Sequence, residues 1–203
     1  MKAEGIVILA LLALLAAAAV LILRTRARLA AVRADLERMS VTDGLTGLFN
    51  RRHLFERFAE EFQEHRRQSM EMGCILVDLD RLRAVNATHG HATGDALLKE
   101  FARIVKASVR IYDVVGRSGG EEFIILLPLT GLLQSMAFAE RVRRTIEQRL
   151  AVAGPSGETV LATISLGVTN LRAGDATVDA VAKRADEALL KAKESGRNRA
   201  ELA

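Results

Sequence analysis

The hydrophobic residues change their pattern twice along the chain. Positions 6–23 are apolar without a break, positions 24–42 carry apolar residues at spacings of three and four, and the remainder alternates between short apolar runs and helical periodicity. A helix of about 20 apolar residues is long enough to cross a bilayer. We therefore expect a transmembrane helix within residues 1–23, a helical stalk over 24–42 and a folded domain over 43–203.

The charges around the apolar run predict its orientation. Lys2 and Glu4 precede it, whereas a cluster of arginines begins at Arg24. The positive-inside rule then places everything after Arg24 in the cytoplasm. A cleaved signal peptide is the alternative, although the run is long for a signal and no convincing small-residue cleavage site precedes the arginines. An anionic membrane surface explains the arginines better than nucleic acid does, so we expect a membrane partner and no nucleic acid.

Residues 24–42 lack glycine and proline, which favours an uninterrupted helix. The apolar stripe in this segment is short and of the a/d type, formed by Leu29, Val32, Leu36 and Met39. Two structures fit this stripe. One is a parallel coiled coil that holds two copies of the domain together, and the other is a single amphipathic helix lying on the membrane or on its own domain.

The domain begins where Gly44 and Gly47 break the helical pattern and Asn50 can cap the next helix. Met72 to Val77 is a continuous apolar run, typical of a central strand buried on both faces. The expected order is a helix over 51–68, this strand, a short helix over 81–87, a loop over 89–94, a helix over 95–109, a hairpin over 111–128, a helix over 132–150, a strand over 159–168, a helix over 177–193 and an edge strand over 199–202. This order predicts an α+β fold with a mixed sheet wrapped by helices.

Acidic residues stand beside two of the predicted strands. The Gly119-Gly120 pair is expected to form a tight two-residue turn with positive φ angles, and two consecutive glutamates, Glu121 and Glu122, follow it. Asp78 ends the central run, where a carboxylate is costly unless it binds something. Asp80, two residues later, is expected to cap the next helix.

A hairpin beside the central strand would bring these carboxylates together. With the main-chain carbonyl of Leu79 they offer the oxygen ligands that Mg²⁺ prefers, and nucleotide phosphates would complete the shell. Two such ions can assist a phosphoryl or nucleotidyl transfer. Lys193 and Arg197 at the end of the last helix suit the outer phosphates, although a basic pair there also complements the helix dipole.

From Asp43 to about Leu202 the chain resembles the GGDEF domains, the diguanylate cyclases of bacteria. The resemblance rests on five motifs in the family's order: Asp43-Gly44-Leu45-Thr46-Gly47-Leu48-Phe49-Asn50-Arg51-Arg52; Asp78-Leu79-Asp80 with Asn86, Gly90-His91 and Gly94-Asp95; Arg117 with Gly119-Gly120-Glu121-Glu122-Phe123; Ser165-Leu166-Gly167-Val168; and Ala185-Asp186-Glu187-Ala188-Leu189 with Lys193 and Gly196-Arg197-Asn198. None of these motifs is decisive alone, but together and at these spacings they are very specific.

The resemblance implies a fold like that of the nucleotidyl cyclases and polymerase palm domains. It implies that two GTP molecules, one on each protomer of a homodimer, are joined into cyclic di-GMP with release of pyrophosphate. Together with the predicted transmembrane helix, it places the expected activity at the bacterial inner membrane. It also implies residue roles: Asp78, Glu121 and Glu122 as catalytic residues; Asp78, the Leu79 carbonyl, Glu121 and Glu122 as ligands of two Mg²⁺ or Mn²⁺ ions; Asn86 and Asp95 as guanine contacts; Gly119 and Gly120 beneath the ribose and base; and Lys193, Arg197 and the amides near Arg81 and Leu82 as phosphate contacts.

The family's product-inhibition site is an Arg-x-x-Asp sequence just upstream of the hairpin. Arg110 and Asp113 stand at that distance, and Arg141 on the following helix matches the family's supporting arginine. The resemblance therefore implies that cyclic di-GMP inhibits its own synthesis here. A surface ion pair is the structural alternative for an isolated sequence of this kind.

Two other functions are compatible with parts of this pattern. A catalytically silent domain could bind cyclic di-GMP or GTP and signal by contact, but the intact carboxylates and phosphate-binding residues argue against that function. A cyclase could make an adenine-containing product, but a carboxylate at Asp95 accepts from the guanine N1 and N2 hydrogens that adenine lacks.

Overall fold

The computed structural model describes residues 15, 19–26, 28–29 and 40–203. Residues 41–203 form one compact unit. Most of the predicted transmembrane helix and stalk lies outside the described residues, although residues 19–26 are helical. Among the described residues, no helix is both long and apolar enough to span a bilayer.

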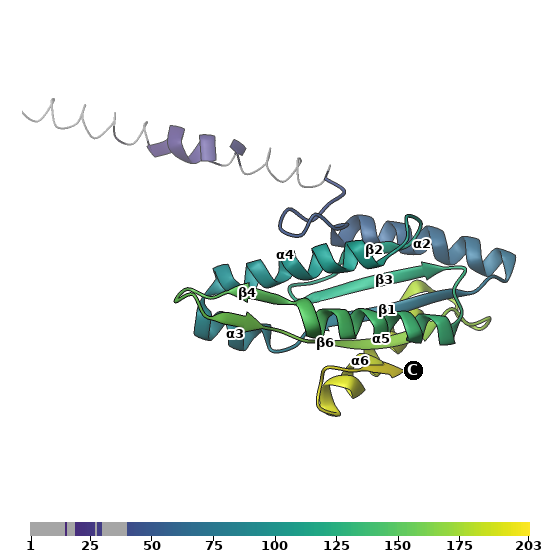
Figure 1. Ribbon diagram of the computed structural model, residues 1–203. Coiled ribbons are helices and arrows are strands. Elements are labelled where there is room, and N and C mark those ends of the chain that lie inside the picture. Colours follow the sequence, from purple (N-terminus) through teal and green to yellow (C-terminus); the bar gives the residue numbers. More distant parts are fainter. Residues whose placement is uncertain (1–14, 16–18, 27, 30–39) are drawn as a thin grey trace, which may run out of the picture. The chain divides into compact units, whose positions relative to one another are not determined.

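A five-stranded sheet forms the centre of residues 41–203, in the order β2-β3-β1-β6-β7. Its strands are β1 (Met72–Leu79), β2 (Val114–Arg117), β3 (Glu122–Pro128), β6 (Ile164–Asn170) and β7 (Ala200–Leu202). Neighbouring strands are antiparallel except β6 and β7, which are parallel. All residues of β1 are buried, as expected for the central strand, and the predicted mixed sheet is confirmed (Figure 1).

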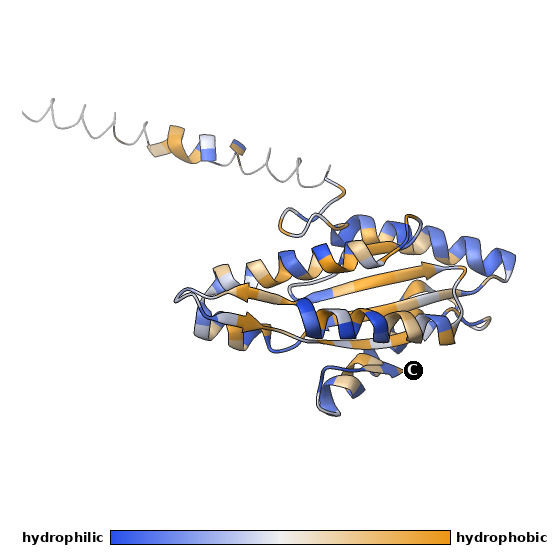
Figure 2. Ribbon diagram, viewed as in Figure 1, coloured by the Kyte–Doolittle hydropathy of each residue, from blue (hydrophilic) through white to orange (hydrophobic). Residues whose placement is uncertain are grey.

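Helices cover both faces of this sheet. They are α2 (Arg51–Gln68), α3 (Leu82–His89), α4 (His91–Ser108), α5 (Leu132–Arg149) and α6 (Val178–Glu194). Side chains alternate between faces along a strand, so Ile75 and Val77 of β1 pack with α4 and α5, whereas Cys74 and Leu76 pack with α2 and α6. Figure 2 shows the same division as hydrophobic strands between helices with mixed surfaces.

Two helices begin at side-chain caps. The Asn50 side chain accepts a hydrogen bond from the His53 N–H at 2.9 Å, which confirms the predicted start of α2. Thr177 accepts from the Ala180 N–H at 3.3 Å at the start of α6. Such caps satisfy amide groups that the helix itself leaves unpaired.

Three local predictions were wrong. The loop expected over 89–94 is helical from His91 onward, because only Gly90 (φ 82°) separates α3 from α4. The strand expected over 159–168 is two strands, since β5 (Thr159–Leu161) leaves the main sheet to pair with β4 (Ala151–Ala153). The hairpin connection spans residues 118–121, and neither of its glycines has a positive φ. The Ser118 N–H instead closes it on the Glu122 carbonyl at 3.0 Å.

The only cysteine, Cys74, provides a test of the packing of this sheet. It lies on β1 with no exposed surface, and burial raises the pKa of its thiol to about 12. We predict that Ellman's reagent will find essentially no reactive thiol in the native protein and one thiol per chain in denaturant, since the thiolate is the reactive form. Fast labelling of native protein would show that the β1–α6 layer opens readily.

Candidate active site

Three carboxylates meet where β1 ends and β3 begins. Asp78 shares with Leu76 the sheet face that α2 and α6 cover. Glu122 stands directly opposite Asp78 in the antiparallel register. Glu121 precedes it, and the carbonyl of Glu121 accepts a hydrogen bond from the Leu79 N–H at 3.2 Å. The pairing of the hairpin with the central strand thus joins acidic segments that are distant in the sequence.

The charge of this cluster is only partly compensated. Burial raises the pKa of the Asp78 carboxyl to about 6 in spite of the Lys193 ammonium, and the charges of Glu121 and Glu122 add to the rise. The Lys193 Nζ lies 3.0 Å from Asp78 Oδ2. The structure therefore places the Lys193 ammonium against the Asp78 carboxylate.

No complete metal centre is arranged in advance among the described residues, since none of their His, Cys, Asp and Glu side chains form a group of three or more able to hold an ion. The available oxygen donors are nevertheless those that suit Mg²⁺. A metal at this site would need Lys193 to withdraw and further oxygen ligands to arrive with a bound molecule.

Asn86 and Asp95 lie on neighbouring helices, α3 and α4, which pack together. The Oδ1 atom of Asn86 is buried without a hydrogen-bond partner. It rests against Gly94, where an added Cβ would come within 1.9 Å of it. Asp95, the next residue, is exposed. A buried acceptor that finds no partner within the described chain is a position at which a ligand can donate a hydrogen bond.

The residues expected at the phosphates lie at the start of α3 and after α6. Arg81 precedes α3 with φ 59°, and no side chain caps the amides that begin with Leu82. Unsatisfied amides at a helix start favour anions. Arg197 is exposed, has φ 64°, and forms no ion pair with any residue that the structure describes.

Asp80 does not cap α3, so that prediction was wrong. Its carboxylate accepts hydrogen bonds from the hydroxyls of Thr163 at 2.7 Å and Ser165 at 2.6 Å, and from the Asn198 N–H at 3.1 Å. The strand β6 pairs with β1, which brings Ser165 and the preceding Thr163 beside Asp80. Asp80 therefore ties together three segments that are far apart in the sequence.

Arg117 holds the hairpin connection in place. Its guanidinium donates to the Gly120 carbonyl at 2.6 Å and to the Asp43 carboxylate at 3.2 Å. The Asp43 carboxylate also accepts from the Thr46 hydroxyl at 2.6 Å. Sequence reasoning gave Arg117 and Asp43 no role, although both stand in the quoted motifs, because nothing in their spacing shows that the two motifs touch.

Arg110, Asp113 and Arg141 line one cavity of about 350 Å³ between the end of α4 and α5. The Asp113 Oδ2 accepts from the Arg110 N–H at 2.7 Å, whereas its Oδ1 is buried and has no hydrogen-bond partner among the described residues. Burial raises the pKa of Asp113 against the lowering effect of both arginines. The Arg141 guanidinium lies 5.1 Å from the Phe138 ring centroid. The structure thus brings the three residues together around an open space.

The model of the family described as "Diguanylate cyclase, GGDEF domain" matches residues 40–199. The chain belongs to this family. The match includes nearly the whole compact unit, with the acidic cluster, both glycines of the hairpin and the Arg110–Asp113 segment.

Relatives with assigned names agree with this membership. The response regulator PleD of Caulobacter vibrioides is 36% identical over 160 residues, which are 79% of this chain and 35% of that protein. Diguanylate cyclase A of Treponema denticola is 33% identical over 187 residues, which are 89% of this chain and 50% of that protein. The chain thus spans between a third and a half of the length of these relatives.

Solved structures of the family share the fold. Diguanylate cyclase SiaD of Pseudomonas aeruginosa, in complex with its activator SiaC, superimposes with a TM-score of 0.77 at 40% identity, covering 89% of this chain and 68% of that chain. The active GGEEF domain of a Vibrio cholerae diguanylate cyclase gives a TM-score of 0.69 at 32% identity, covering 75% and 96%. The present GGDEF domain also carries the Gly-Gly-Glu-Glu-Phe form of the motif, at residues 119–123.

Proposed function

We propose that this GGDEF domain is an active diguanylate cyclase that condenses two GTP molecules into cyclic di-GMP and pyrophosphate. The observation that carries the proposal is the meeting of Asp78, Glu121 and Glu122 at one end of the sheet, beside the Lys193 ammonium. Such a concentration of negative charge is costly in a folded domain unless it serves a cation and its substrate.

The carboxylates and the Leu79 carbonyl would hold two Mg²⁺ or Mn²⁺ ions. When bound, these ions neutralise charge that develops on the attacking and leaving oxygens. Lys193 would leave Asp78 and contact the outer phosphates with Arg197, so substrate and metal bind together. Glu121, at the mouth of the hairpin, would accept the proton of the attacking 3′-hydroxyl.

Guanine would be recognised between α3 and α4. The unpartnered Asn86 Oδ1 is a buried acceptor beside the exposed Asp95 carboxylate. Together they suit a base edge that donates hydrogen bonds, and adenine lacks the N1 and N2 donors of guanine. Leaving such polar groups unpaired is strongly unfavourable, so ATP should be excluded. The bare hairpin at Gly119 and Gly120 leaves room for ribose and base, since a Cβ at Gly120 would meet nothing within 4 Å.

One protomer holds one GTP, and each 3′-hydroxyl must reach the α-phosphate of the other nucleotide. The active unit is therefore a homodimer with two facing sites. We further propose that residues 1–23 anchor the chain in the bacterial inner membrane with the GGDEF domain in the cytoplasm, and that the stalk over 24–42 holds two copies together.

Incubating the purified protein with GTP and Mg²⁺ tests the proposed activity. We expect cyclic di-GMP and pyrophosphate. Deletion of residues 1–42 should make the specific activity depend more steeply on protein concentration, because the active unit contains two chains. Neither product at any protein concentration, combined with measurable binding of GTP or cyclic di-GMP, would instead identify a silent receptor. Adding ATP alongside GTP tests for a mixed product, which we expect to be absent.

We also propose that cyclic di-GMP inhibits the enzyme from the cavity of Arg110, Asp113 and Arg141. Arginine both grips phosphate and stacks on guanine. Replacing Arg110 by alanine should raise the inhibition constant for cyclic di-GMP by roughly tenfold or more, since a charge-assisted contact is lost, while the initial rate stays unchanged. The measurement is a product-inhibition curve.

Arg103→Ala is a matched control for that curve. Arg103 lies on α4, shortly before Arg110 in the chain, but its guanidinium pairs with Glu100 at 2.6 Å and does not line the cavity. Its removal should leave inhibition unaltered. Equal inhibition constants for the Arg110 variant and the wild type would show that this cavity is not the site of product inhibition.

A further inference from the structure

The loop between α6 and β7 has an energetically costly backbone. Three consecutive residues lie in the left-handed region, with φ values of 114° at Gly196, 64° at Arg197 and 48° at Asn198. Glycine adopts this region freely, but any other residue is strained there and persists only where its surroundings impose it. Arg197 and Asn198 must therefore be held by their neighbours.

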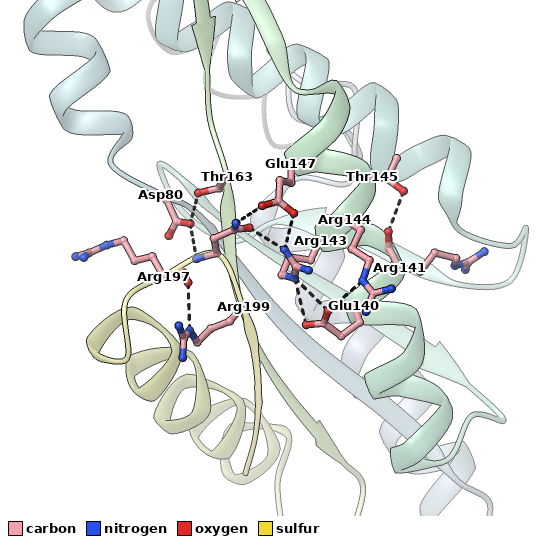
Figure 3. A network of polar contacts seen from close by, with 11 residues as sticks. Asp80, Glu140, Arg141, Arg143, Arg144, Thr145, Glu147, Thr163, Arg197 and Arg199 are labelled. Carbon is pink, nitrogen blue, oxygen red and sulfur yellow. Dashed lines mark hydrogen bonds and ion pairs between the residues drawn. The ribbon is translucent and has the colours of Figure 1, made fainter.

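Asn198 joins this loop to the rest of the domain, whereas the Arg197 N–H bonds only to the end of α6, at the Ala192 carbonyl (2.9 Å). The Asn198 N–H donates to Asp80 at 3.1 Å. Its side-chain amide donates to Glu147 Oε1 at 2.7 Å and accepts from the Arg143 guanidinium at 3.1 Å. Backbone and side chain are thus fixed from two directions. Figure 3 labels Asp80, Arg143 and Glu147, the residues that hold them.

The groups that hold Asn198 are themselves rigidly placed. Asp80 is 6% exposed and fixed by two hydroxyls of the segment 163–165. Arg143 lies between two carboxylates of its own helix, Glu140 at 3.1 Å and Glu147 at 2.9 Å. The residue after β1 and the last turns of α5 therefore converge on one asparagine, and the segment 163–165 fixes Asp80 in turn.

Nothing comparable fixes Arg197. Its guanidinium is exposed and forms no ion pair with a described residue. Its hydrogen bonds are made by the backbone: the Arg197 N–H donates to the Ala192 carbonyl at 2.9 Å, and the Arg197 carbonyl accepts from the Arg199 guanidinium at 3.2 Å. The direction of the Arg197 side chain is consequently set by the backbone of its loop. Arg197, Asn198 and Glu147 border an open cavity of about 600 Å³ that also reaches Arg81 at the start of α3.

We propose that Asp80, Arg143 and Glu147 are positioning residues for the phosphates of the nucleotide. Acting through Asn198, they hold the loop in the conformation that directs Arg197 toward the phosphate groups. This inference rests on the proposed function in taking GTP as the ligand. The proposal predicts that loss of these contacts weakens binding of the triphosphate but not of the base. The proposed base site lies between α3 and α4, at Asn86 and Asp95, and neither of these residues contacts Asn198.

This proposal is tested by measuring the Kd of two nucleotides for the full chain in the presence of Mg²⁺. The first is 3′-deoxy-GTP, which carries the triphosphate but lacks the hydroxyl needed for condensation, and the second is GMP. We expect Glu147→Ala and Asn198→Gly to raise the Kd for 3′-deoxy-GTP roughly tenfold, as expected when an arginine–phosphate contact is misplaced, and to change the Kd for GMP less than about twofold. Glycine tolerates the left-handed backbone at 198, so that variant removes the side-chain contacts without adding strain.

Two further variants provide controls. Glu147→Gln keeps an oxygen acceptor for the Asn198 amide and should restore most of the triphosphate affinity. Glu100→Ala removes a carboxylate that pairs with Arg103 on α4 and contacts neither Asn198 nor the groups that hold it, and should behave as the wild type. Unchanged triphosphate affinity in Glu147→Ala and Asn198→Gly, or equal weakening of both nucleotides, would overturn the positioning role. A wild-type chain that binds neither nucleotide would instead overturn the assignment of GTP, and this proposal with it.

Discussion

Glu121→Gln should lower the rate of cyclic di-GMP formation by roughly a thousandfold, which corresponds to about 4 kcal/mol of lost transition-state stabilisation. The substitution removes one negative charge from a cluster whose mutual repulsion already contributes to the raised pKa of Asp78. It removes the proposed metal ligand and proton acceptor while keeping the shape of the side chain. Initial rates with saturating GTP and Mg²⁺ measure the effect.

The same substitution should not destabilise the domain. Glu121 is only partly buried. Its hydrogen bond to the Leu79 N–H is made by the backbone carbonyl, which the substitution leaves in place. Relief of repulsion with Asp78 should leave the melting temperature equal or slightly higher. Glu64→Gln, an exposed change on α2, is the matched control and should affect neither quantity. More than a tenth of the wild-type rate in the Glu121 variant would contradict its assignment as a metal ligand.

Gly167→Ala should destabilise the domain by roughly 3 kcal/mol. A Cβ at Gly167 would lie 1.9 Å from the Ala185 carbonyl oxygen and 2.4 Å from the Leu189 nitrogen, both of which belong to the backbone of α6. A helix backbone cannot rotate out of the way, so α6 must move away from β6. Because α6 also carries Lys193, activity should fall together with the free energy of unfolding measured in urea.

Gly73→Ala offers a contrast within the same sheet. The added Cβ would come within 2.0 Å of the Ser135 hydroxyl oxygen, but this atom is the end of a short side chain. That hydroxyl has no hydrogen-bond partner among the described residues and can rotate without losing one. We therefore expect a destabilisation of about 1 kcal/mol or less. Equal losses of unfolding free energy in the two variants would show that the close approach of α6 is not the reason why residue 167 must be glycine.

The sequence by itself determined the elements whose causes are local. The apolar run from Met72 predicted a central strand because only a strand buried on both faces tolerates such a run. Asn50 predicted the start of α2 because its side chain satisfies an amide three residues away. The glycines and glutamates of residues 119–122 predicted a hairpin with acidic chemistry, and the spacing of the motifs was sufficient to indicate the family.

Tertiary structure decided the contacts between distant segments. Asp80 was expected to cap the helix beside it, but its partners lie 83, 85 and 118 residues away, and no local pattern encodes which strand will lie alongside. Lys193 was assigned to phosphates, yet the fold places its ammonium 3.0 Å from Asp78. Periodicity shows which face of an element is buried, whereas the identity of the neighbour, and therefore the hydrogen bonds and charges of the site, depends on how the whole chain packs.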